Sequence, residues 1–307
     1  MPNAENTIEI IKRIHMGGFV FSIVSLLSSF FILILISFSK ILRSLTYNFL
    51  IRVFISEFIG NIGKIFEYEK ESGNLLYNKI SLILIPFSDM YTMILFCFFS
   101  ICSVELIIKS NRNIKEKENK YYKISFLTSF VYTVIINIFL QNYHYNGKVR
   151  FYFYEDSKLN YLRFIHIGIL VIMTFYISYN TFIVIQFMKE KQKSDKINAW
   201  KIAKLIKVLF RFPLICFLYW ILYIPNLTLT YFDKSKNKYF TYIVMLFSVS
   251  SFSLRGFLLF LNTIQTNKVQ IVLERLIINF KQRFILLSKN RKWSISDINK
   301  IKGKEED

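Results

Sequence analysis

Charges inside apolar stretches are the residues of this sequence with the clearest chemical potential. Glu57 lies in FLIRVFISEFIGNIG, Asp89 in ILIPFSDMYTMILF and Arg255 in SVSSFSLRGFLLFL. An unpaired charge in the middle of an apolar layer costs several kcal/mol. Glu57 and Arg255 have opposite signs and similar depth, so we expect an ion pair with a structural role or a direct role in switching. Asp89 is expected either to line a ligand pocket or to act as a polar group between packed helices.

Catalytic and metal chemistry are not indicated by the remaining reactive side chains. The chain has three histidines, His15, His144 and His166, and no metal-ligand spacing such as i, i+4 connects them. A zinc-dependent membrane hydrolase would need several His and Asp side chains facing one cavity. The three cysteines all lie in apolar runs and are expected to be small buried residues rather than ligands or disulfide partners. We therefore expect neither an enzyme nor a protein that holds a cofactor or a metal.

The charges occur in a chain of 307 residues that is 53% hydrophobic and 18% aromatic. About 20 apolar residues are needed to cross the hydrocarbon layer of a membrane. Seven runs reach that length, at 14–39, 44–65, 80–108, 121–142, 159–188, 206–230 and 240–266. We therefore expect an all-α membrane protein with a seven-helix bundle over residues 14–266, the alternative being a soluble helical protein with a large core. The first run is too long for the apolar part of a signal peptide, so we expect it to be retained.

The basic residues indicate how the chain is oriented. Lys and Arg number 40 against 20 Asp and Glu, and they cluster between the apolar runs. Such blocks are typical of basic loops on one side of a membrane rather than of a nucleic-acid-binding surface. Alternate loops and the C-terminal tail hold 25 of these cations and the other loops and N-terminal tail hold 11, when lysines at span ends are counted with the adjoining loop. This asymmetry predicts a multi-pass plasma-membrane protein with residues 1–13 outside and the C-terminus in the cytoplasm.

Two segments outside the runs have patterns of their own. Residues 143–156 read YHYNGKVRFYFYED, and Asn146-Gly147 between aromatic and β-branched residues predicts a β-hairpin over the extracellular mouth. The alternative for this segment is an irregular polar loop. Residues 267–286 have apolar side chains at helical spacing with Lys and Arg on other faces, which predicts an amphipathic helix on an anionic inner leaflet. The polar residues 287–307 are expected to be disordered.

Short motifs recur at particular places in the predicted spans. They are Arg43 and Ser56-Glu57-Phe58 in span two, Phe87 and Tyr91-Thr92 in span three, Lys120-Tyr121-Tyr122 opening span four, Phe212-Pro213 and Trp220 in span six, and Gly256-Phe257 in span seven. This set resembles the cyclic-AMP-receptor-like, or class E-like, family of seven-span G-protein-coupled receptors, over residues 40–262. The chain departs from the family in lacking the cysteine that opens span three, and in having Leu259 and Thr263 where the family has Asn and Tyr.

The resemblance implies a receptor that binds an extracellular ligand and activates a heterotrimeric G protein when span six moves at Pro213. It does not imply that cyclic AMP is the ligand. Candidate ligand-binding residues are Asp89, Tyr152, Arg163 and His166. For Arg163 and His166 the alternative is snorkelling or contact with a loop. The basic loop between spans five and six and the helix at 267–286 are expected to form the coupling surface.

The inner ends of spans three and six are expected to touch in such a receptor. Glu105 and Arg211 lie at these ends, so an ion pair between them would hold span six closed, with Pro213 as the bend and Trp220 further along the same span. The alternative is that Arg211 reaches lipid phosphate and Glu105 meets a loop lysine. Other candidate functions are a transporter or channel subunit, whose path the charges on spans two, three and seven would line, and a chemosensory receptor of another family.

Overall fold

The computed structural model describes residues 4–39, 42, 45–68, 75–108, 114–141, 160–194, 211, 215, 238–266 and 268–282. Within these ranges the chain is helical and contains no strand. The helices are α1 (Ala4–Phe38), α2 (Leu45–Tyr68), α3 (Leu75–Ile107), α4 (Ile114–Gln141), α5 (Asn160–Ser194) and α7 (Lys238–Ile264), followed by a helix at 268–282. The predicted hairpin at 143–156 and most of the predicted span at 206–230 lie outside the described residues.

Three of these helices are long and apolar enough to cross a membrane. The qualifying segments are Met16–Ser37 in α1, Lys79–Glu105 in α3 and Ile165–Lys193 in α5. A fourth is formed by α7 if its two parts, Ile243–Ser251 and Ser253–Ile264, count as one span with a bend of 49°. The described residues are therefore all helical, and their long apolar helices indicate a membrane-associated protein. The spans predicted at 44–65 and 121–142 overlap α2, in which charged residues are spread from Arg52 to Glu67, and α4, whose charged residues all lie in its first ten positions.

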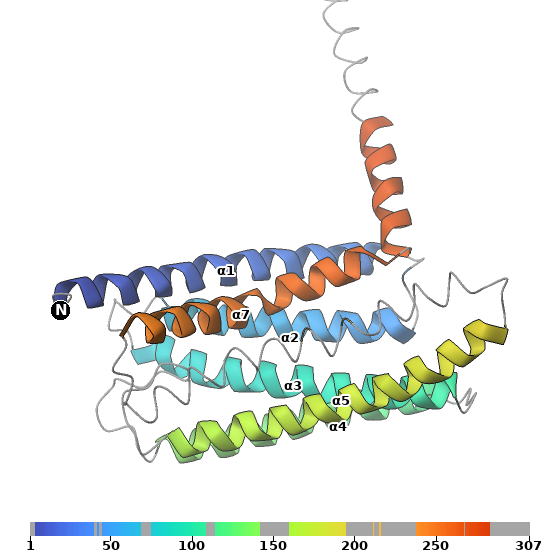
Figure 1. Ribbon diagram of the computed structural model, residues 1–307. Coiled ribbons are helices and arrows are strands. Elements are labelled where there is room, and N and C mark those ends of the chain that lie inside the picture. The colour runs from blue at the N-terminus through green and yellow to red at the C-terminus, as the bar shows by residue number, and fades with distance from the viewer. Residues whose placement is uncertain are drawn as a thin grey trace, which may run out of the picture.

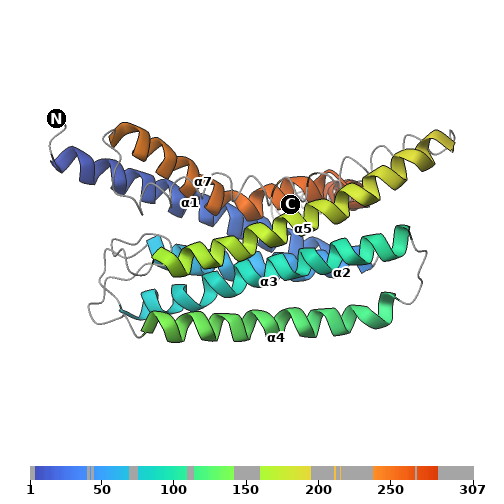
Figure 2. The same cartoon turned by 60° about the horizontal axis from the view of Figure 1, so that its bottom comes forward.

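The six labelled helices run along a common axis as a bundle (Figure 1). In sequence order, α1 packs on α2 and α7, α2 packs on α3, and α3 packs on both α4 and α5. Figure 2 shows α3 between α2 and α4, with α5 crossing over it. The helix at 268–282 turns sharply away from the bundle axis (Figure 1). Because α3 contacts α2 on one side and α4 and α5 on the other, side chains on α3 are placed to connect the two sides of the bundle.

Glycines and serines let α2 and α3 approach closely. A Cβ atom on Gly60 would lie 2.3 Å from Ser88 Oγ, and one on Gly63 would lie 2.9 Å from Leu84 Cβ. Across the same contact Ser56 Oγ donates to Ser88 O at 2.9 Å, and Ser88 Oγ donates to Ser56 O at 2.7 Å. Small residues of this kind allow helix backbones to come close and hydrogen-bond in a membrane. This contact fixes Glu57, the residue after Ser56, against α3.

Proline 86 lies inside α3 and has no backbone N–H. The carbonyl of Leu82, four residues earlier, therefore loses its usual partner within the helix. Asn137 on α4 replaces that partner, because its Nδ2 donates to Leu82 O at 3.1 Å and also to Thr133 O at 2.8 Å. The proline is thus accommodated by a side chain from the neighbouring helix.

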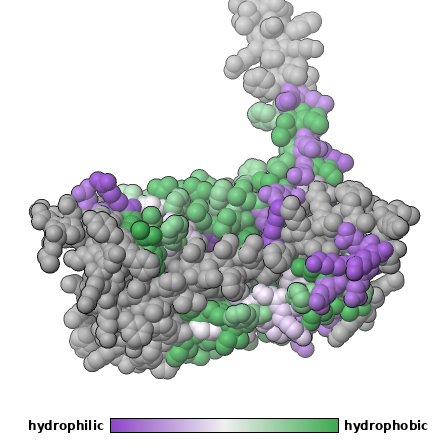
Figure 3. All heavy atoms as spheres, in the orientation of Figure 1, coloured by the Kyte–Doolittle hydropathy of each residue, from purple (hydrophilic) through white to green (hydrophobic). Residues whose placement is uncertain are grey.

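The outer surface of the bundle is apolar. Green, apolar side chains cover much of the described surface along the bundle in Figure 3, and purple, hydrophilic ones gather near its two ends. The exposed members include Leu127 and Phe130 on α4 and Ile172, Phe175 and Tyr179 on α5, each at least 53% exposed. A surface of this kind fits a lipid environment better than water, where apolar patches this large are rare on a monomer.

Candidate functional site: a buried ion cluster

Arg255 on α7 binds two acids from two other helices. Its Nε lies 2.8 Å from Glu57 Oε1 on α2, and its Nη2 lies 2.8 Å from Asp89 Oδ1 on α3. The exposed fractions are 3% for Arg255, 0% for Glu57 and 1% for Asp89. The predicted pairing of Glu57 with Arg255 is present, and Asp89, which the sequence left between two roles, is a second partner of the same cation. The three residues connect α2, α3 and α7 in the interior.

Hydroxyl groups position the Glu57 carboxylate. Thr92 Oγ1, one turn along α3 from Asp89, lies 3.2 Å from Glu57 Oε1 and 2.9 Å from Ser56 Oγ. Its single proton is therefore shared between two acceptors. Thr92 lies at the α2–α3 contact that the Ser56–Ser88 hydrogen bonds close. The carboxylate is thus held by its own helix, by α3 and by α7.

The helix α7 reaches this cluster at a bend. Its two parts meet at 49° between Ser251 and Ser253, just before Arg255. Gly256 follows, and a Cβ atom there would lie 2.9 Å from Ser25 Oγ and 3.0 Å from Ser29 Oγ on α1. The backbone N–H of Phe257 donates to Ser25 Oγ at 2.9 Å. A side chain at position 256 would push α7 off α1, so glycine is required for Arg255 to reach its two acids.

The polar cluster continues along one face of α2. Asn61, Lys64 and Glu67 follow Glu57 at spacings of four, three and three, which places them on the same side of the helix. All three are at most 1% exposed. The Lys64 ammonium is within electrostatic reach of Glu57, Asp89, Glu67 and Arg255. Five charged side chains are therefore buried together. Lys64 and Glu67 were not among the predicted site residues, although their spacing from Glu57 was a signal for them.

His166 lies on the other side of α3 from Arg255. It is 2% exposed, its Nδ1 is hydrogen-bonded to the hydroxyl of Tyr132 on α4, and the two rings are stacked with centroids 5.6 Å apart. Asp89 is within electrostatic reach of both side chains. His166 is thus a buried residue between helices rather than one that snorkels to the surface.

Four predicted functional residues are outside what the structure describes in atomic detail. Tyr152, Pro213 and Trp220 lie outside the described residues, and Arg163 is in α5 without a described side chain. Their expected roles in ligand binding and in the movement of span six stay predictions. Among the described residues no group of three or more His, Cys, Asp or Glu side chains is arranged to hold a metal ion.

Of the two expectations for Glu105, the contact with a lysine of the adjoining predicted loop is confirmed, and the ion pair with Arg211 is wrong. Glu105 instead binds Lys117 near the start of α4, with Nζ 3.1 Å from Oε2. Arg211 donates to the side chain of Gln265, just after α7. The reason is local, because the connection between α3 and α4 is short and brings Lys117 back beside Glu105. The hydrogen bond from Lys117 to Glu105 raises the pKa of the ammonium, so the pair is fully formed at neutral pH and is lost only as the pH rises above the usual lysine value.

A second cation lies among aromatic rings. The guanidinium of Arg52 lies 3.7 Å from the centroid of the Tyr122 ring, a distance suited to a cation–π contact. The Tyr122 hydroxyl donates to Glu118 Oε1 at 2.6 Å, and the neighbouring Tyr121 stacks on Phe98. The Lys-Tyr-Tyr motif at the start of span four therefore anchors α4 on α2 and α3. The motif is visible in the sequence, whereas its contact with Arg52 is not.

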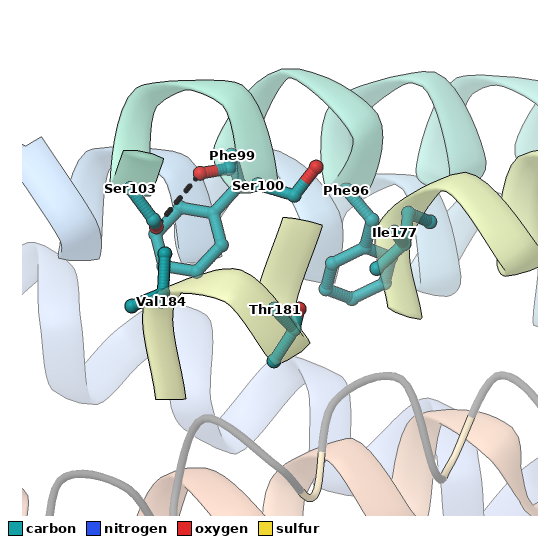
Figure 4. Close-up of a pocket in the computed structure, with 7 residues that line it drawn as sticks. All are labelled: Phe96, Phe99, Ser100, Ser103, Ile177, Thr181 and Val184. Atoms are coloured by element: carbon teal, nitrogen blue, oxygen red, sulfur yellow. Dashed lines mark hydrogen bonds between the residues drawn. The ribbon is translucent and has the colours of Figure 1, made fainter. Parts of the chain in front are cut away.

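The cavity described between α3 and α5 is too small to bind a signalling molecule. Its volume is about 20 Å³, which is room for about one water molecule. Phe96, Phe99, Ser100, Ser103, Ile177, Thr181 and Val184 line it, as Figure 4 shows. The hydroxyl of Ser103 donates to the Phe99 carbonyl at 2.8 Å, and Asn180 Nδ2 donates to Ser100 Oγ at 3.2 Å. The buried ion cluster, rather than this cavity, is the candidate functional site.

Comparison of the chain with models of known protein families gives no match, and no curated protein sequence matches it significantly. The fold and the ion cluster define a helical membrane protein with a charged interior.

Proposed function

We propose that this chain is a seven-span receptor, similar to the cyclic-AMP-receptor-like family, that senses an extracellular ligand and activates a heterotrimeric G protein. The observation that carries the proposal is the binding of Arg255 to acids on two other helices. Buried charged pairs contribute little net stability, because desolvation offsets most of their attraction. Their best-supported use is to specify one arrangement among several. A contact that joins α2, α3 and α7 is suited to hold one of two arrangements of a receptor bundle.

A receptor of this kind changes state when a ligand binds one arrangement better than the other. Breaking either contact of Arg255 leaves charge in an apolar interior, so the cluster resists intermediate positions of α7. Two well-separated states follow, which is the behaviour that a switch requires. The hydrogen bond of Tyr47 at the start of α2 with Thr266 after α7, at 3.2 Å, supports transmission of such a movement to the helix at 268–282.

The proposed topology rests on the distribution of basic residues. With 25 cations on one side and 11 on the other, the N-terminus is outside the plasma membrane and the C-terminus is cytoplasmic. This topology puts the segment 143–156 on the extracellular side. The helix at 268–282 lies on the anionic inner leaflet and, with the basic loop between spans five and six, contacts the G protein.

The test is nucleotide exchange on purified G proteins by the chain reconstituted in lipid nanodiscs. Because the cluster is proposed to hold the resting state, Arg255→Gln is expected to change ligand-free exchange at matched amounts of folded protein. Lys117→Gln is the matched control, since its ion pair is exposed, and is expected to leave exchange as it is. If neither the wild-type chain nor Arg255→Gln alters exchange on any G-protein class, with or without a ligand library, the receptor proposal is wrong.

A transporter or channel subunit is the second candidate. The observation in its favour is the row of buried polar side chains on α2 from Glu57 to Glu67, because ionisable residues inside membranes often mark ion paths. Flux of ions or protons into liposomes that contain the purified chain separates the two proposals. Flux that depends on Lys64 without any effect on G proteins would favour the transporter.

A further inference from the structure

Arg52 is a cation about two turns into α2, within the predicted span 44–65. Its guanidinium carbon lies 3.7 Å from the centroid of the Tyr122 ring, and its Nε is buried without a hydrogen-bond partner in the described part of the chain. No carboxylate of the described residues lies within ion-pair distance of this guanidinium. The cation–π contact offsets only part of the cost of an arginine at this depth, so an anion from outside the described chain would stabilise it further.

Two tyrosine hydroxyls from other helices lie beside Arg52. Tyr91 on α3 and Tyr122 on α4 are both within hydrogen-bonding reach of the guanidinium. The Tyr122 hydroxyl gives its proton to Glu118 Oε1 at 2.6 Å, so that proton is already used. A Tyr91 hydroxyl that accepts from Arg52 keeps its own proton for another acceptor. Arg52 and Tyr91 together therefore offer donors to an anion with several oxygens.

Arg52 lies where the surface of the bundle is open to lipid. Its side chain is partly exposed, and α2 and α4 each pack on α3 rather than extensively on each other. One turn further along α2, Ile55 is exposed, and one turn further along α4 than Tyr122, Phe126 is exposed. The Phe126 ring meets the Tyr91 ring edge-on. The polar groups therefore stand at the head of a strip of exposed apolar side chains that leads toward the middle of the bundle.

The depth of this position matches the edge of the apolar layer. Tyr122 is the second residue of the predicted span 121–142, and the exposed Lys120 and Lys123 flank it and Tyr121. Basic side chains at such a level attract anionic lipid headgroups. They also repel the trimethylammonium group of a choline headgroup, because like charges placed together are unfavourable.

We propose that Arg52 and Tyr91 form a binding site for the phosphate of an anionic phospholipid, whose acyl chain lies along Ile55 and Phe126. A guanidinium offers parallel N–H groups that match two phosphate oxygens, and Tyr91 donates to a third. Free phosphate would leave the apolar strip uncovered, so the ligand is the lipid rather than the inorganic ion. The site belongs equally to a receptor or a transporter, because it requires only that the bundle lies in a membrane.

Thermal unfolding of the purified chain in uncharged detergent tests the proposal. A ligand that binds only the folded chain raises the unfolding midpoint, so titration with dioctanoyl phosphatidylglycerol should raise it. Arg52→Gln should weaken this lipid about tenfold or more, the effect of losing a charge-assisted hydrogen bond. Arg13→Gln is the matched control, since Arg13 forms an exposed pair with Glu9 on α1, and should bind as the wild type does. Equal responses of Arg52→Gln and the wild type would overturn the proposal.

Further arms of the same assay identify the ligand and the place. Dioctanoyl phosphatidylcholine, and inorganic phosphate at matched ionic strength, should raise the midpoint far less than the anionic lipid does. Tyr91→Phe removes only the second donor, so it should fold and bind the lipid severalfold more weakly even if Arg52→Gln does not fold. Arg275→Gln, on the helix at 268–282, should bind as the wild type does. An equal rise with inorganic phosphate, wild-type binding by Tyr91→Phe, or a loss confined to Arg275→Gln would each contradict the proposal.

Fluorescence quenching in nanodiscs locates the acyl chain. Phe126→Trp places a fluorophore on the apolar strip, and its signal is the difference from the wild-type chain. Phosphatidylglycerol with brominated acyl chains should quench this signal more strongly than brominated phosphatidylcholine at the same mole fraction. The difference should disappear when Arg52→Gln is added to Phe126→Trp. Equal quenching by the two lipids in Phe126→Trp alone would overturn the proposal.

Discussion

Asp89 and Glu105 are two acids on the same helix, each in an ion pair of similar length. Asp89 is 1% exposed and lies 2.8 Å from Arg255, whereas Glu105 is 18% exposed and lies 3.1 Å from Lys117, which is itself 42% exposed. Water and salt screen the second pair, and exposed pairs contribute little to stability. The first pair has no such screening, so loss of either partner leaves charge in an apolar interior. Burial rather than distance therefore decides which of the two pairs is costly to break.

The largest effect in this comparison is expected for loss of the shared cation. Arg255→Gln leaves the Asp89 carboxylate without its partner and should destabilise the folded chain by about 3–5 kcal/mol, as for other broken buried pairs. The measurement is thermal unfolding in nanodiscs, followed by tryptophan fluorescence. Lys117→Gln breaks the exposed pair and is the matched control. Equal midpoints for the two variants would mean that burial does not separate these pairs.

The close contact of α2 and α3 brings Glu57 to Asp89. Widening this contact should have the next largest effect on the stability of the folded chain. Gly60→Ala places a Cβ atom where Ser88 Oγ is 2.3 Å away, and overpacking of this kind costs about 1–3 kcal/mol. Gly17→Ala is the control, because nothing lies within 4 Å of a Cβ atom at that position. We expect a lower unfolding midpoint for Gly60→Ala alone. An unchanged midpoint would show that the two helices pack less closely than described.

The proline in α3 gives a smaller and more local test. Asn137→Ala removes the donor to the Leu82 carbonyl and should cost about 1–3 kcal/mol, the penalty for an unsatisfied buried acceptor. Pro86→Ala restores a backbone N–H that can bind the same carbonyl. The cost of Asn137→Ala should therefore be smaller in the Pro86→Ala background. If the cost is the same in both backgrounds, Asn137 has another role.

The smallest effect on stability is expected for the exposed pair of Glu105 and Lys117. Glu105→Gln should leave the unfolding midpoint at pH 7 nearly unchanged, because the Glu105–Lys117 pair is open to water. The bond to Glu105 raises the pKa of Lys117, so the pair stabilises the fold at neutral pH and is lost only as the pH rises past the usual lysine value. Wild type and Glu105→Gln should converge above that pH. A large drop in the unfolding midpoint of Glu105→Gln at pH 7 would instead show that Glu105 is important for the stability of the bundle.

Much of the fold could be predicted from apolar length, because membrane-spanning helices are set by a simple physical requirement. The predicted span at 44–65 corresponds closely to α2, although three charged residues, including Glu57, interrupt it. The pairing of Glu57 with Arg255 followed from sign and depth. The contact of Arg255 with Asp89 could not be predicted in the same way. It depends on how closely α2 and α3 lie side by side, and the small residues that set this distance give no strong sequence signal.

The incorrect prediction has an equally physical origin. Glu105 and Arg211 were placed together because a general receptor plan brings the ends of spans three and six into contact. The local chain instead offers Glu105 a nearer cation, Lys117, after a short connection. A nearby partner needs little ordering of the chain and is favoured over a distant one. The receptor plan did not indicate which lysine or arginine each acid meets.

A double-mutant cycle tests whether Arg255 and Asp89 form a buried pair that stabilises one arrangement of the bundle. The free energies of unfolding of wild type, Arg255→Gln, Asp89→Asn and the double variant are compared in the same nanodiscs. If the two residues form a buried pair, the double variant should be more stable than Arg255→Gln, with a coupling energy of about 2 kcal/mol, within the range for contacting residues. Additive losses, with the double variant the least stable of the four, would contradict the account.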